Sequence, residues 1–525
     1  MAQSNTIWPI SGHRTISVDT FQTLSNRAPG LLLGALIFYL FYKYTRRIYF
    51  HPLSGIPGPR LAAATHLYEA YYNILRQGLS KRAIQLHRTY NSPVIRIGTN
   101  RVHVGDPSYY HTLRIYNSGT DYCKDPGVYK LLGIDGSILT ITDPEEHKQY
   151  RSIVGSLFSR KTADELAPMM AALLNKSAES MAHQGRDGNP SVIQRVYRSV
   201  AADMVSYLLF NRPLGLIDSP QDADHYHSFM LSIDRFTAIT WPRFYYPILN
   251  WVIDSFPTFV VERLQPGLRN LQELFKQWLD ECIVAHDAGK PVESRSTYLD
   301  LMIEAKRKTG EPLRPDLLFD DILNYLVAGM EATSYVLSFG TYFLLNKPDA
   351  KAKLEAELRE ASPFIREEFD HRRIMALPYL TAVVKECLRL SNTVPGFLPR
   401  IVPKGGVDIG GYHIPGGTQI SMIHPVVELN EEIFPNPHEF IPERWLGDNG
   451  HDLEKWGIAF SKGRRQCIGK NLAYMMLYTS LAVFFSRLEM ELYETTAADM
   501  EIIDQFAPII QGVVKVKITK DRWRE

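Results

Sequence analysis

Helical periodicity dominates the pattern of hydrophobic and polar positions along the chain. The longest periodic segment runs from Pro315 to Leu345, and Pro348 follows its end. At a rise of about 1.5 Å per residue it would span roughly 45 Å, enough to cross a whole domain. Residues 163–284 are also mainly helical in pattern, with few breaks. We therefore expect a mainly helical fold with one helix long enough to cross it.

Only short runs have the pattern of β-strands. Residues 93–97 and 101–104 are rich in β-branched side chains, and Thr99-Asn100 between them predicts a hairpin. A glycine-rich stretch at residues 405–417 predicts a second ribbon. It contains neither G-x-G-x-x-G nor G-K-[ST], so it does not indicate a phosphate loop. The expected fold class is mainly α with small β-sheets.

The N-terminal part of the chain has a different pattern. Residues 1–27 are polar and irregular, whereas residues 28–44 carry a single charge, Lys43, and are followed by Arg46 and Arg47. A membrane span needs about 20 apolar residues, and about 17 at the least, so residues 28–44 form a marginal transmembrane anchor. Its basic C-terminal flank predicts that the rest of the chain lies in the cytosol. A cleaved signal peptide, which would begin nearer the start of the chain, and a buried core helix are the alternatives.

A stiff hinge is predicted between this anchor and the rest of the chain. Residues 45–60 include three prolines and two glycines, which cannot continue a helix. Residues 61–525 follow this hinge, and a chain of this length would normally contain several domains.

Composition excludes some classes of function. The formal net charge of +1 gives no argument for a nucleic-acid partner. The four cysteines are far apart and form no C-x-x-C pair, so they predict neither a disulfide framework nor covalent haem attachment. This usage fits a reducing compartment.

The candidate chemistry lies in the stretch F-S-K-G-R-R-Q-C-I-G, which runs from Phe460 to Gly469. Cys467 precedes an apolar helical run, and Arg465 lies just before it. Because a free thiol is mostly protonated at neutral pH, a positive charge, a helix N-terminus or a metal must stabilise its anion. Gly463 and Gly469 would let the backbone turn tightly beside a large, flat group. A buried structural cysteine in a turn is the alternative, although a turn needs neither the arginine nor the phenylalanine.

This stretch resembles the haem-binding loop of the cytochrome P-450 family, F-x-x-G-x-R-x-C-x-G. Every fixed position is matched, by Phe460, Gly463, Arg465, Cys467 and Gly469. The resemblance implies the P-450 fold and haem b (iron protoporphyrin IX) as cofactor. It also implies that Cys467 is the axial ligand of the iron and that Phe460, Arg465 and Gly469 contact the cofactor.

Three further residues would bind haem carboxylates if the resemblance holds. A helix that begins at Asp143 contains His147 and Arg151, four residues apart and therefore on one face. The family has W-x-x-x-R at this place, so His147 replaces the tryptophan. Arg400 matches a third haem-carboxylate ligand of the family. The alternative for His147 and Arg151 is that they lie on a solvated helix face.

The middle of the central helix resembles the family's A/G-G-x-D/E-T motif. Ala328, Gly329 and Glu331 match it, but Ala332 occupies the threonine position and Thr333 comes one residue later. Thr333 would point about 100° away on an ideal helix. The resemblance implies Glu331 and Thr333 as candidates for proton delivery to the iron site. Helix packing is the alternative explanation for Gly329, and a buried ion pair for Glu331.

A structural network is predicted from two separated motifs. Glu386 and Arg389 form E-x-x-R, a pair that means little alone because exposed ion pairs at this spacing are common and weak. Arg444 lies in F-I-P-E-R-W, which resembles the family's F-x-P-E-R-W. In the family these three residues form one buried network that supports the cysteine loop.

Together these motifs resemble those of fungal microsomal P-450 enzymes of secondary metabolism, including trichodiene-oxygenase-like members. The implied function is a monooxygenase of the endoplasmic reticulum membrane, single-pass and with a cytosolic catalytic domain. It would use dioxygen to oxidise an apolar intermediate, with a terpenoid as the best substrate class.

Electrons would have to come from another protein, because the chain has no nicotinamide or flavin motif. The expected partner is NADPH-cytochrome P-450 reductase. Lys462, Arg464 and Lys470 could form its docking face, although a solvated basic surface would look the same. Two other classes stay open: a haem-thiolate isomerase or dehydratase that needs no external electrons, and a non-catalytic haem sensor.

Overall fold

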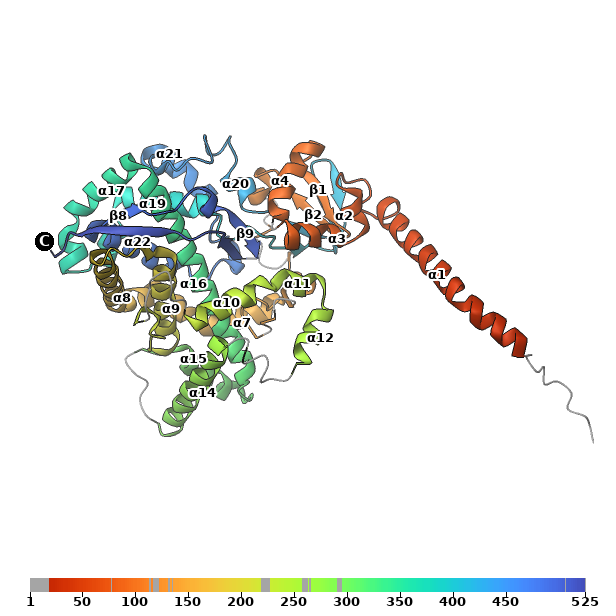
Figure 1. The fold of residues 1–525 in the computed structure, drawn as a ribbon, viewed down its shortest axis with the longest axis horizontal. Helices are drawn as coiled ribbons and strands as arrows, with labels where there is room; N and C mark the ends of the chain where they lie inside the picture. Colours follow the sequence, from red (N-terminus) through yellow and green to blue (C-terminus); the bar gives the residue numbers. More distant parts are fainter. Residues whose placement is uncertain are drawn as a thin grey trace, which may run out of the picture.

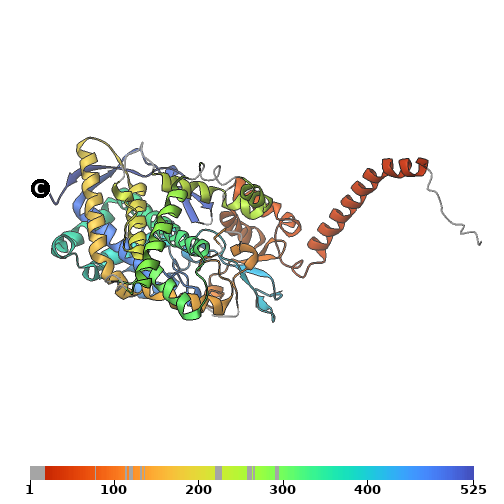
Figure 2. The ribbon, with the colours of Figure 1, turned by 90° about the horizontal axis from the view of Figure 1, so that it is seen from below.

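The computed structural model describes residues 18–76, 78–112, 115–116, 122–130, 133–134, 136–218, 227–256, 263, 266–289, 295–505 and 507–524. Most of them form a mainly helical body with small sheets, as the sequence predicts (Figure 1). Helix α1 (Val18–Tyr49) projects from this body, and the C-terminus lies at the opposite end (Figures 1 and 2).

The helices that precede the central one are α2 (Arg60–Ala64), α3 (Leu67–Ala70), α4 (Leu79–Tyr90), α5 (Ser108–Thr112), α6 (Pro126–Tyr129), α7 (Pro144–Val154), α8 (Arg160–Arg186), α9 (Ile193–Phe210), α10 (Ser228–Ala238), α11 (Thr240–Tyr245), α12 (Ile248–Asp254), α14 (Pro266–Asp287) and α15 (Tyr298–Thr309). The central helix α16 (Pro315–Asn346) is followed by α17 (Pro348–Glu360), α18 (His371–Ile374), α19 (Pro378–Ser391), α20 (Pro425–Glu428), α21 (Gly447–Leu453) and α22 (Lys470–Arg487). Short 3₁₀ or π turns are η1 (Tyr71–Leu75), η3 (Gly155–Phe158), η4 (Leu216–Asp218), η5 (Pro363–Glu367), η6 (Pro442–Trp445), η7 (Glu454–Trp456), η8 (Gly463–Arg465) and η9 (Ala498–Met500).

Four small sheets accompany the helices in the part of the chain that the structure describes. The largest has the order β1-β2-β7-β4, built from β1 (Val94–Gly98), β2 (Arg101–Val104), β7 (Gln419–Ser421) and β4 (Arg400–Ile401). The others pair β3 (Ser191–Val192) and β8 (Leu488–Leu492) with β11 (Lys515–Asp521), β9 (Ile502–Gln505) with β10 (Ala507–Ile510), and β5 (Val407–Ile409) with β6 (Tyr412–Ile414). Both predicted ribbons are confirmed: β1 and β2 pair antiparallel, and so do β5 and β6.

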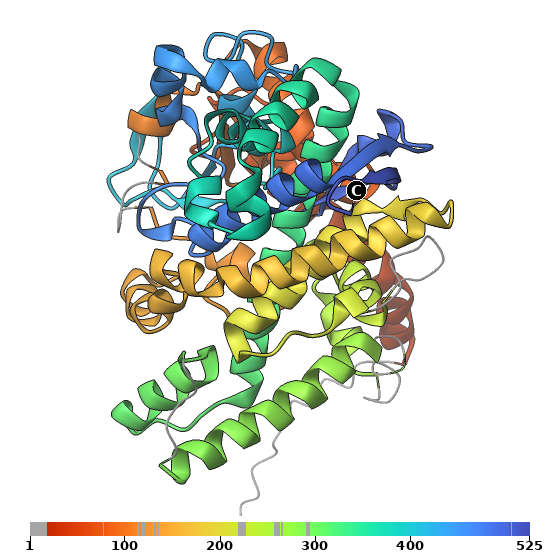
Figure 3. The same cartoon turned by 90° about the vertical axis from the view of Figure 1, so that its left-hand side faces the viewer.

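Helix α16 runs through the middle of the body, and its bounds agree with the predicted segment to one residue (Figure 1). It packs against α9, α19 and α22. Figure 3 shows the long helix α8, in amber, crossing the body, where it lies against α22 and β11. A β-carbon at Gly329 would lie 2.7 Å from the Val205 side chain of α9, so glycine allows the close approach of α16 and α9 at this point.

The N-terminal helix is longer than the predicted anchor. It continues through Arg46 and Arg47 to Tyr49, because the first proline of the predicted hinge, Pro52, comes seven residues after the start of that hinge at residue 45. Among the residues that the structure describes, no helix combines the length and the apolar character that a membrane crossing requires.

The predicted network of Glu386, Arg389 and Arg444 is brought together. The fully buried Glu386 carboxylate accepts hydrogen bonds from Arg389 at 2.7 and 2.9 Å and from Arg444 Nε at 3.1 Å. Trp445 Nε1 and the Ile441 amide donate to the same carboxylate at 2.8 and 3.0 Å. These contacts join α19 to the segment that contains η6.

Removal of this carboxylate should be costly for stability. We expect Glu386→Ala to lower the free energy of unfolding by about 3–5 kcal/mol, because it leaves buried arginines without their counter-charge. Urea unfolding of the haem-loaded protein, followed by far-ultraviolet circular dichroism, measures the change. Lys385→Ala is the matched control, because Lys385 directly precedes Glu386 in the chain. This change removes a partly exposed ion pair with Glu454, and its loss should cost less than about 1 kcal/mol. Equal, small losses in both variants would contradict a supporting role for Glu386.

Candidate active site

The cysteine loop holds its sulfur in an unusual position. The Cys467 amide donates a hydrogen bond to the carbonyl of Phe460 at 3.0 Å, which closes the loop just before α22. Burial raises the pKa of the Cys467 thiol, whereas the Gly469 amide, Arg151 and Lys470 lower it. The residue is nevertheless exposed. On one side the described residues leave the Cys467 side chain uncovered, and a bound group could reach the sulfur there.

A second surface without a packing partner lies in the middle of α16. Ala328 is exposed and Ala332 is half-buried, although most of the neighbouring residues of this helix are buried. They are four residues apart and therefore share one face. Electrostatics connects this helix to the cysteine loop, since Arg151 interacts both with Cys467 and with Tyr325 of α16. Arg151 thus lies near both the cysteine loop and α16.

Five basic side chains lie close to one another beside the cysteine loop, and few acidic groups accompany them among the residues that the structure describes. Burial and the neighbouring cations Arg400 and Arg465 hold the pKa of Lys124 well below its usual range. Burial and Arg400 lower the pKa of Arg465 to about 10. Burial lowers the pKa of His147 to about 3, with further repulsion from Arg465, Lys124 and Arg151. Mutual repulsion of this kind indicates a site for a bound anion.

The hydrogen bonds of these cations hold them in place but do not neutralise them. Arg465 donates to the three carbonyls of residues 141–143 at 2.7–3.1 Å. Arg151 donates to the carbonyl of Gln466 at 2.7 Å, so it also holds the cysteine loop. Arg400 donates to a tyrosine hydroxyl at 2.9 Å and to two neighbouring carbonyls. All of these acceptors are uncharged.

Haem fits this arrangement. Its iron would take the Cys467 thiolate, its two carboxylates would meet the cations, and the small side chains of Ala328 and Ala332 leave room for a flat ring and its ligand. Of the residues predicted from the sequence, His147, Arg151, Arg400, Arg465 and Cys467 are thus brought together. Phe460 and Gly469 form the two sides of the cysteine loop.

Lys124 is a site residue that sequence reasoning missed. It is buried and lies among the same basic side chains. Its backbone forms an isolated antiparallel β-bridge with the backbone of Arg400. Its only local signal is its place just before Asp125-Pro126, the start of α6. That signal indicates a helix start and carries no information about a ligand.

Glu331 and Thr333 lie in different environments. Glu331 is 2.5 Å from Arg198 of α9, which also binds Asp234 of α10 at 2.7 Å. Burial raises the pKa of Glu331, although Arg198 opposes this. Thr333 is only 4% exposed and lies about 140° around the helix from Ala328, so it does not share the alanine face.

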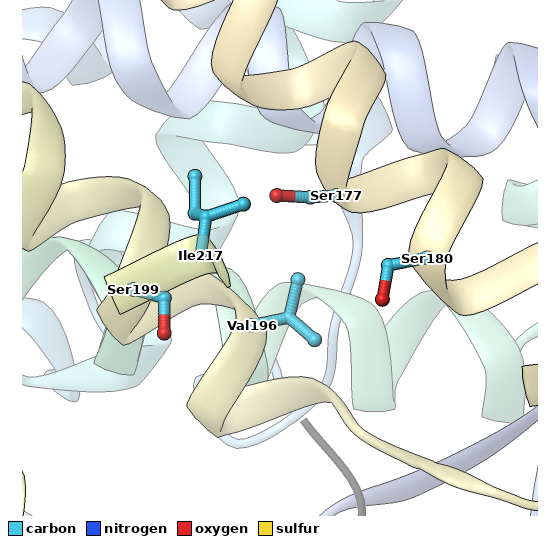
Figure 4. Close-up of a pocket in the computed structure, with 5 residues that line it drawn as sticks. All are labelled: Ser177, Ser180, Val196, Ser199 and Ile217. Atoms are coloured by element: carbon cyan, nitrogen blue, oxygen red, sulfur yellow. The ribbon is translucent and has the colours of Figure 1, made fainter. Parts of the chain in front are cut away.

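A separate small pocket lies between α8, α9 and η4. It is lined by Ser177, Ser180, Val196, Ser199 and Ile217 (Figure 4). None of these residues is charged, and none belongs to the predicted site. We interpret it as a packing gap with polar walls.

Comparison with known proteins gives matches over most of the chain. The family model described as Cytochrome P450 matches residues 58–515. The chain is 91% identical over its full length, and that of its relative, to cytochrome P450 monooxygenase ankB of Aspergillus thermomutatus. It is 38% identical to cytochrome P450 monooxygenase phqM of Penicillium fellutanum, over 90% of this chain and 89% of that one. Cytochrome P450 monooxygenase cloA of Claviceps purpurea (strain 20.1) is 37% identical over 93% and 95% of the two chains.

A solved structure has the same fold. The crystal structure of the cytochrome P450DA heme domain superimposes with a TM-score of 0.70, covering 90% of this chain and 98% of the other at 18% identity. At this identity the match shows the fold alone.

The role of Lys124 can be tested by the rate of haem loss. We expect Lys124→Met to release haem on the order of 10–100 times faster, because a hydrogen bond to a charged group contributes about 1.5–3 kcal/mol. Transfer of haem to an excess of a haem-scavenging apoprotein measures the rate. Lys130→Met serves as the control, because it changes an exposed lysine at the C-terminal end of α6, the short helix that Lys124 precedes. Identical rates in the two variants and the parent would remove Lys124 from the site.

Proposed function

Because the chain belongs to the cytochrome P450 family, whose haem b is held by a cysteine thiolate, we propose that Cys467 provides this thiolate. The enzyme is a cytochrome P450 monooxygenase. The observation that carries the assignment is the thiol of Cys467, desolvated but exposed, beside a group of unbalanced cations. Bound haem supplies the activation of dioxygen, and the protein provides position, dryness and protons.

The cations orient the cofactor in this proposal. Arg400, Arg465 and Lys124 would bind its carboxylates, and the depressed pKa of His147 keeps that imidazole neutral and able to donate one hydrogen bond. Arg151 has a different role, because its guanidinium is directed to the carbonyl of Gln466 next to the axial cysteine. It would hold the loop and favour the anionic sulfur.

Glu331 is our candidate for moving protons into the site. Burial raises its pKa, so it binds a proton more readily than an exposed carboxyl would. It is held between Arg198 of α9 and the alanine face, and Asp234 of α10 competes for the same arginine. Exchange of Arg198 between these two carboxylates would free Glu331 to turn inward. Thr333, the other candidate named from the sequence, has no such access from its buried position.

An apolar small molecule suits the surface that is left for a substrate. Ala328 and Ala332 expose methyl groups, and Val394 and Leu398 of the segment before β4 are partly exposed. Phe397, between them, is buried and packs edge-on against His103 of β2, so it belongs to the sheet. We propose an apolar intermediate of secondary metabolism, with a terpenoid as the class to test first.

Membrane attachment is proposed through residues 28–44 of α1, after the N-terminal segment 1–27 and before the hinge 45–60 and the catalytic domain 61–525. The described part of α1 exposes many large apolar side chains that no other element covers, including Leu32, Phe38 and Phe41. These side chains support attachment to a membrane, and we propose a single-pass anchor in the endoplasmic reticulum with the catalytic domain in the cytosol.

The basic residues beside the cysteine loop support a docking site for NADPH-cytochrome P450 reductase. Arg464 is exposed, and Lys462 and Lys470 are half-buried beside it. An acidic reductase surface would be attracted to them in a salt-dependent manner.

Substitutions in α16 test the proton route. We expect Glu331→Gln to lower the turnover number about 100-fold, in the range of general acid–base effects, with little change in haem binding. Thr333→Ala is the matched variant and should keep the parent rate, because its hydroxyl is buried away from the alanine face. Product formation per NADPH consumed is the measurement. A larger loss in Thr333→Ala than in Glu331→Gln would assign the role to Thr333.

Dependence on electrons tests the reaction class. Membranes that contain this enzyme should form an oxygenated product from an apolar substrate only with NADPH, reductase and dioxygen, and one atom of ¹⁸O₂ should enter the product. The relatives named above are all monooxygenases, which favours this outcome. Product formed without NADPH and reductase would instead favour an isomerase or dehydratase.

Release of the enzyme from the same membranes by a carbonate wash would contradict the anchor.

A further inference from the structure

Three metal-ligating side chains meet where α14 packs against α15, outside the haem site. They are Cys282 and His286 of α14 and Asp300 of α15. His286 Nε2 lies 2.8 Å from Asp300 Oδ1, and Cys282 Sγ lies 3.3 Å from the same oxygen. Their donor atoms all lie within 4.8 Å of one another, and the described ranges contain no second group of this kind.

Helix periodicity brings the two residues of α14 to this place. The buried stripe of α14 consists of Leu271, Phe275 and Leu279, at a spacing of four residues. Cys282 and His286 continue this stripe by three and then four residues, so they face the body. The stripe thus ends in a thiol and an imidazole at the point where α15 begins.

The carboxylate of Asp300 is fixed by the start of α15. Its Oδ2 accepts hydrogen bonds from the amide and the hydroxyl of Thr297, both at 2.7 Å, in a capping box. Its Oδ1 is left to face α14, where the thiol and the imidazole both donate to it. The side chains of His286 and Asp300 are only 13% and 9% exposed, so little water competes for these groups.

We propose that Cys282, His286 and Asp300 bind a zinc-like divalent cation that joins α14 to α15. A thiolate, an imidazole and a carboxylate are the protein ligands that Zn²⁺ takes, and water would complete a four-coordinate site. Tetrahedral zinc with normal bond lengths places nitrogen and oxygen ligands about 3.3–3.5 Å apart and a sulfur ligand about 3.5–3.7 Å from either of them. The observed separations of 2.8 and 3.3 Å need only small side-chain shifts to reach these values.

The protons balance without a further reactant. On binding, the Cys282 thiol releases its proton to solvent, and the proton on His286 Nε2 is replaced by one on Nδ1. Zn²⁺ with a thiolate and a carboxylate then forms a neutral site. Burial and Asp300 raise the pKa of the Cys282 thiol to about 12, so without a metal this thiol stays protonated and unreactive.

The structural alternative is a His–Asp ion pair beside a cysteine that fills space. Such a pair would need no sulfur near its carboxylate. It would also keep its geometry when serine replaces Cys282, and it would show no preference for zinc. The two explanations therefore differ in whether zinc binds and in whether replacing the sulfur of Cys282 by the oxygen of serine changes that binding.

Zinc binding to the haem-loaded full-length enzyme distinguishes them. The enzyme is treated with a chelator, which leaves haem iron in place, and is titrated with Zn²⁺ against a zinc-sensitive dye; bound zinc is counted per haem. We expect one tightly bound zinc, which protects Cys282 from alkylation as measured by mass spectrometry. Cys282→Ser and His286→Ala should each weaken binding by more than the 10–100-fold typical of changes around a metal ligand.

The control removes a histidine–aspartate pair that has no cysteine. His183 of α8 forms an exposed pair with Asp187 at 3.0 Å, so His183→Ala should keep the zinc stoichiometry and affinity. An unchanged haem spectrum shows that each variant is folded. Absence of tight zinc, or equal binding by Cys282→Ser and His183→Ala, would overturn the proposal and leave only adventitious binding at the surface.

Discussion

A sulfur atom held in the protein interior next to concentrated positive charge is the constraint on which the rest of this structure depends. Burial opposes the anionic form of Cys467, and only the Gly469 amide and nearby cations oppose burial. The cations have the converse problem, because they repel one another and bind uncharged oxygens. Bound haem would resolve both: its iron would be held by the Cys467 thiolate, and its carboxylates would balance the cations. It would thereby join the cysteine loop, α7 and the segment around Lys124.

The scaffold holds these parts at fixed separations. Gly329 lets α16 approach α9, while Ala328 and Ala332 of the same helix are exposed and half-buried. Glu386 anchors the segment around η6 on α19, and Phe440 of that segment stacks on Phe343 of α16 with ring centres 5.3 Å apart. Packing contacts outside the site therefore fix the positions of the helices that carry the site residues. The site residues themselves keep unbalanced charges without their cofactor.

Local motifs predicted much of the site, and long-range contacts account for what they missed. The cysteine loop, the bounds of α16 and the pairing of Glu386 with Arg389 follow from residues close together in sequence. The place of Thr333 off the alanine face also follows, because it needs only the 100° step of a helix. Lys124 and Arg198 could not be found this way. Each meets the site only through the fold, Arg198 from a position 133 residues before Glu331, and neither has a motif of its own. The cluster of Cys282, His286 and Asp300 was missed for the same reason, since its third member comes from another helix.

The most direct test of the account is the difference spectrum of the reduced enzyme with and without carbon monoxide, recorded beside Cys467→Ala. The account predicts a Soret band at the strongly red-shifted position of a haem with a thiolate opposite carbon monoxide, and the loss of that band in the variant. A band at the ordinary position of histidine-ligated haem, or the same shifted band in Cys467→Ala, would contradict the central claim that Cys467 binds the iron.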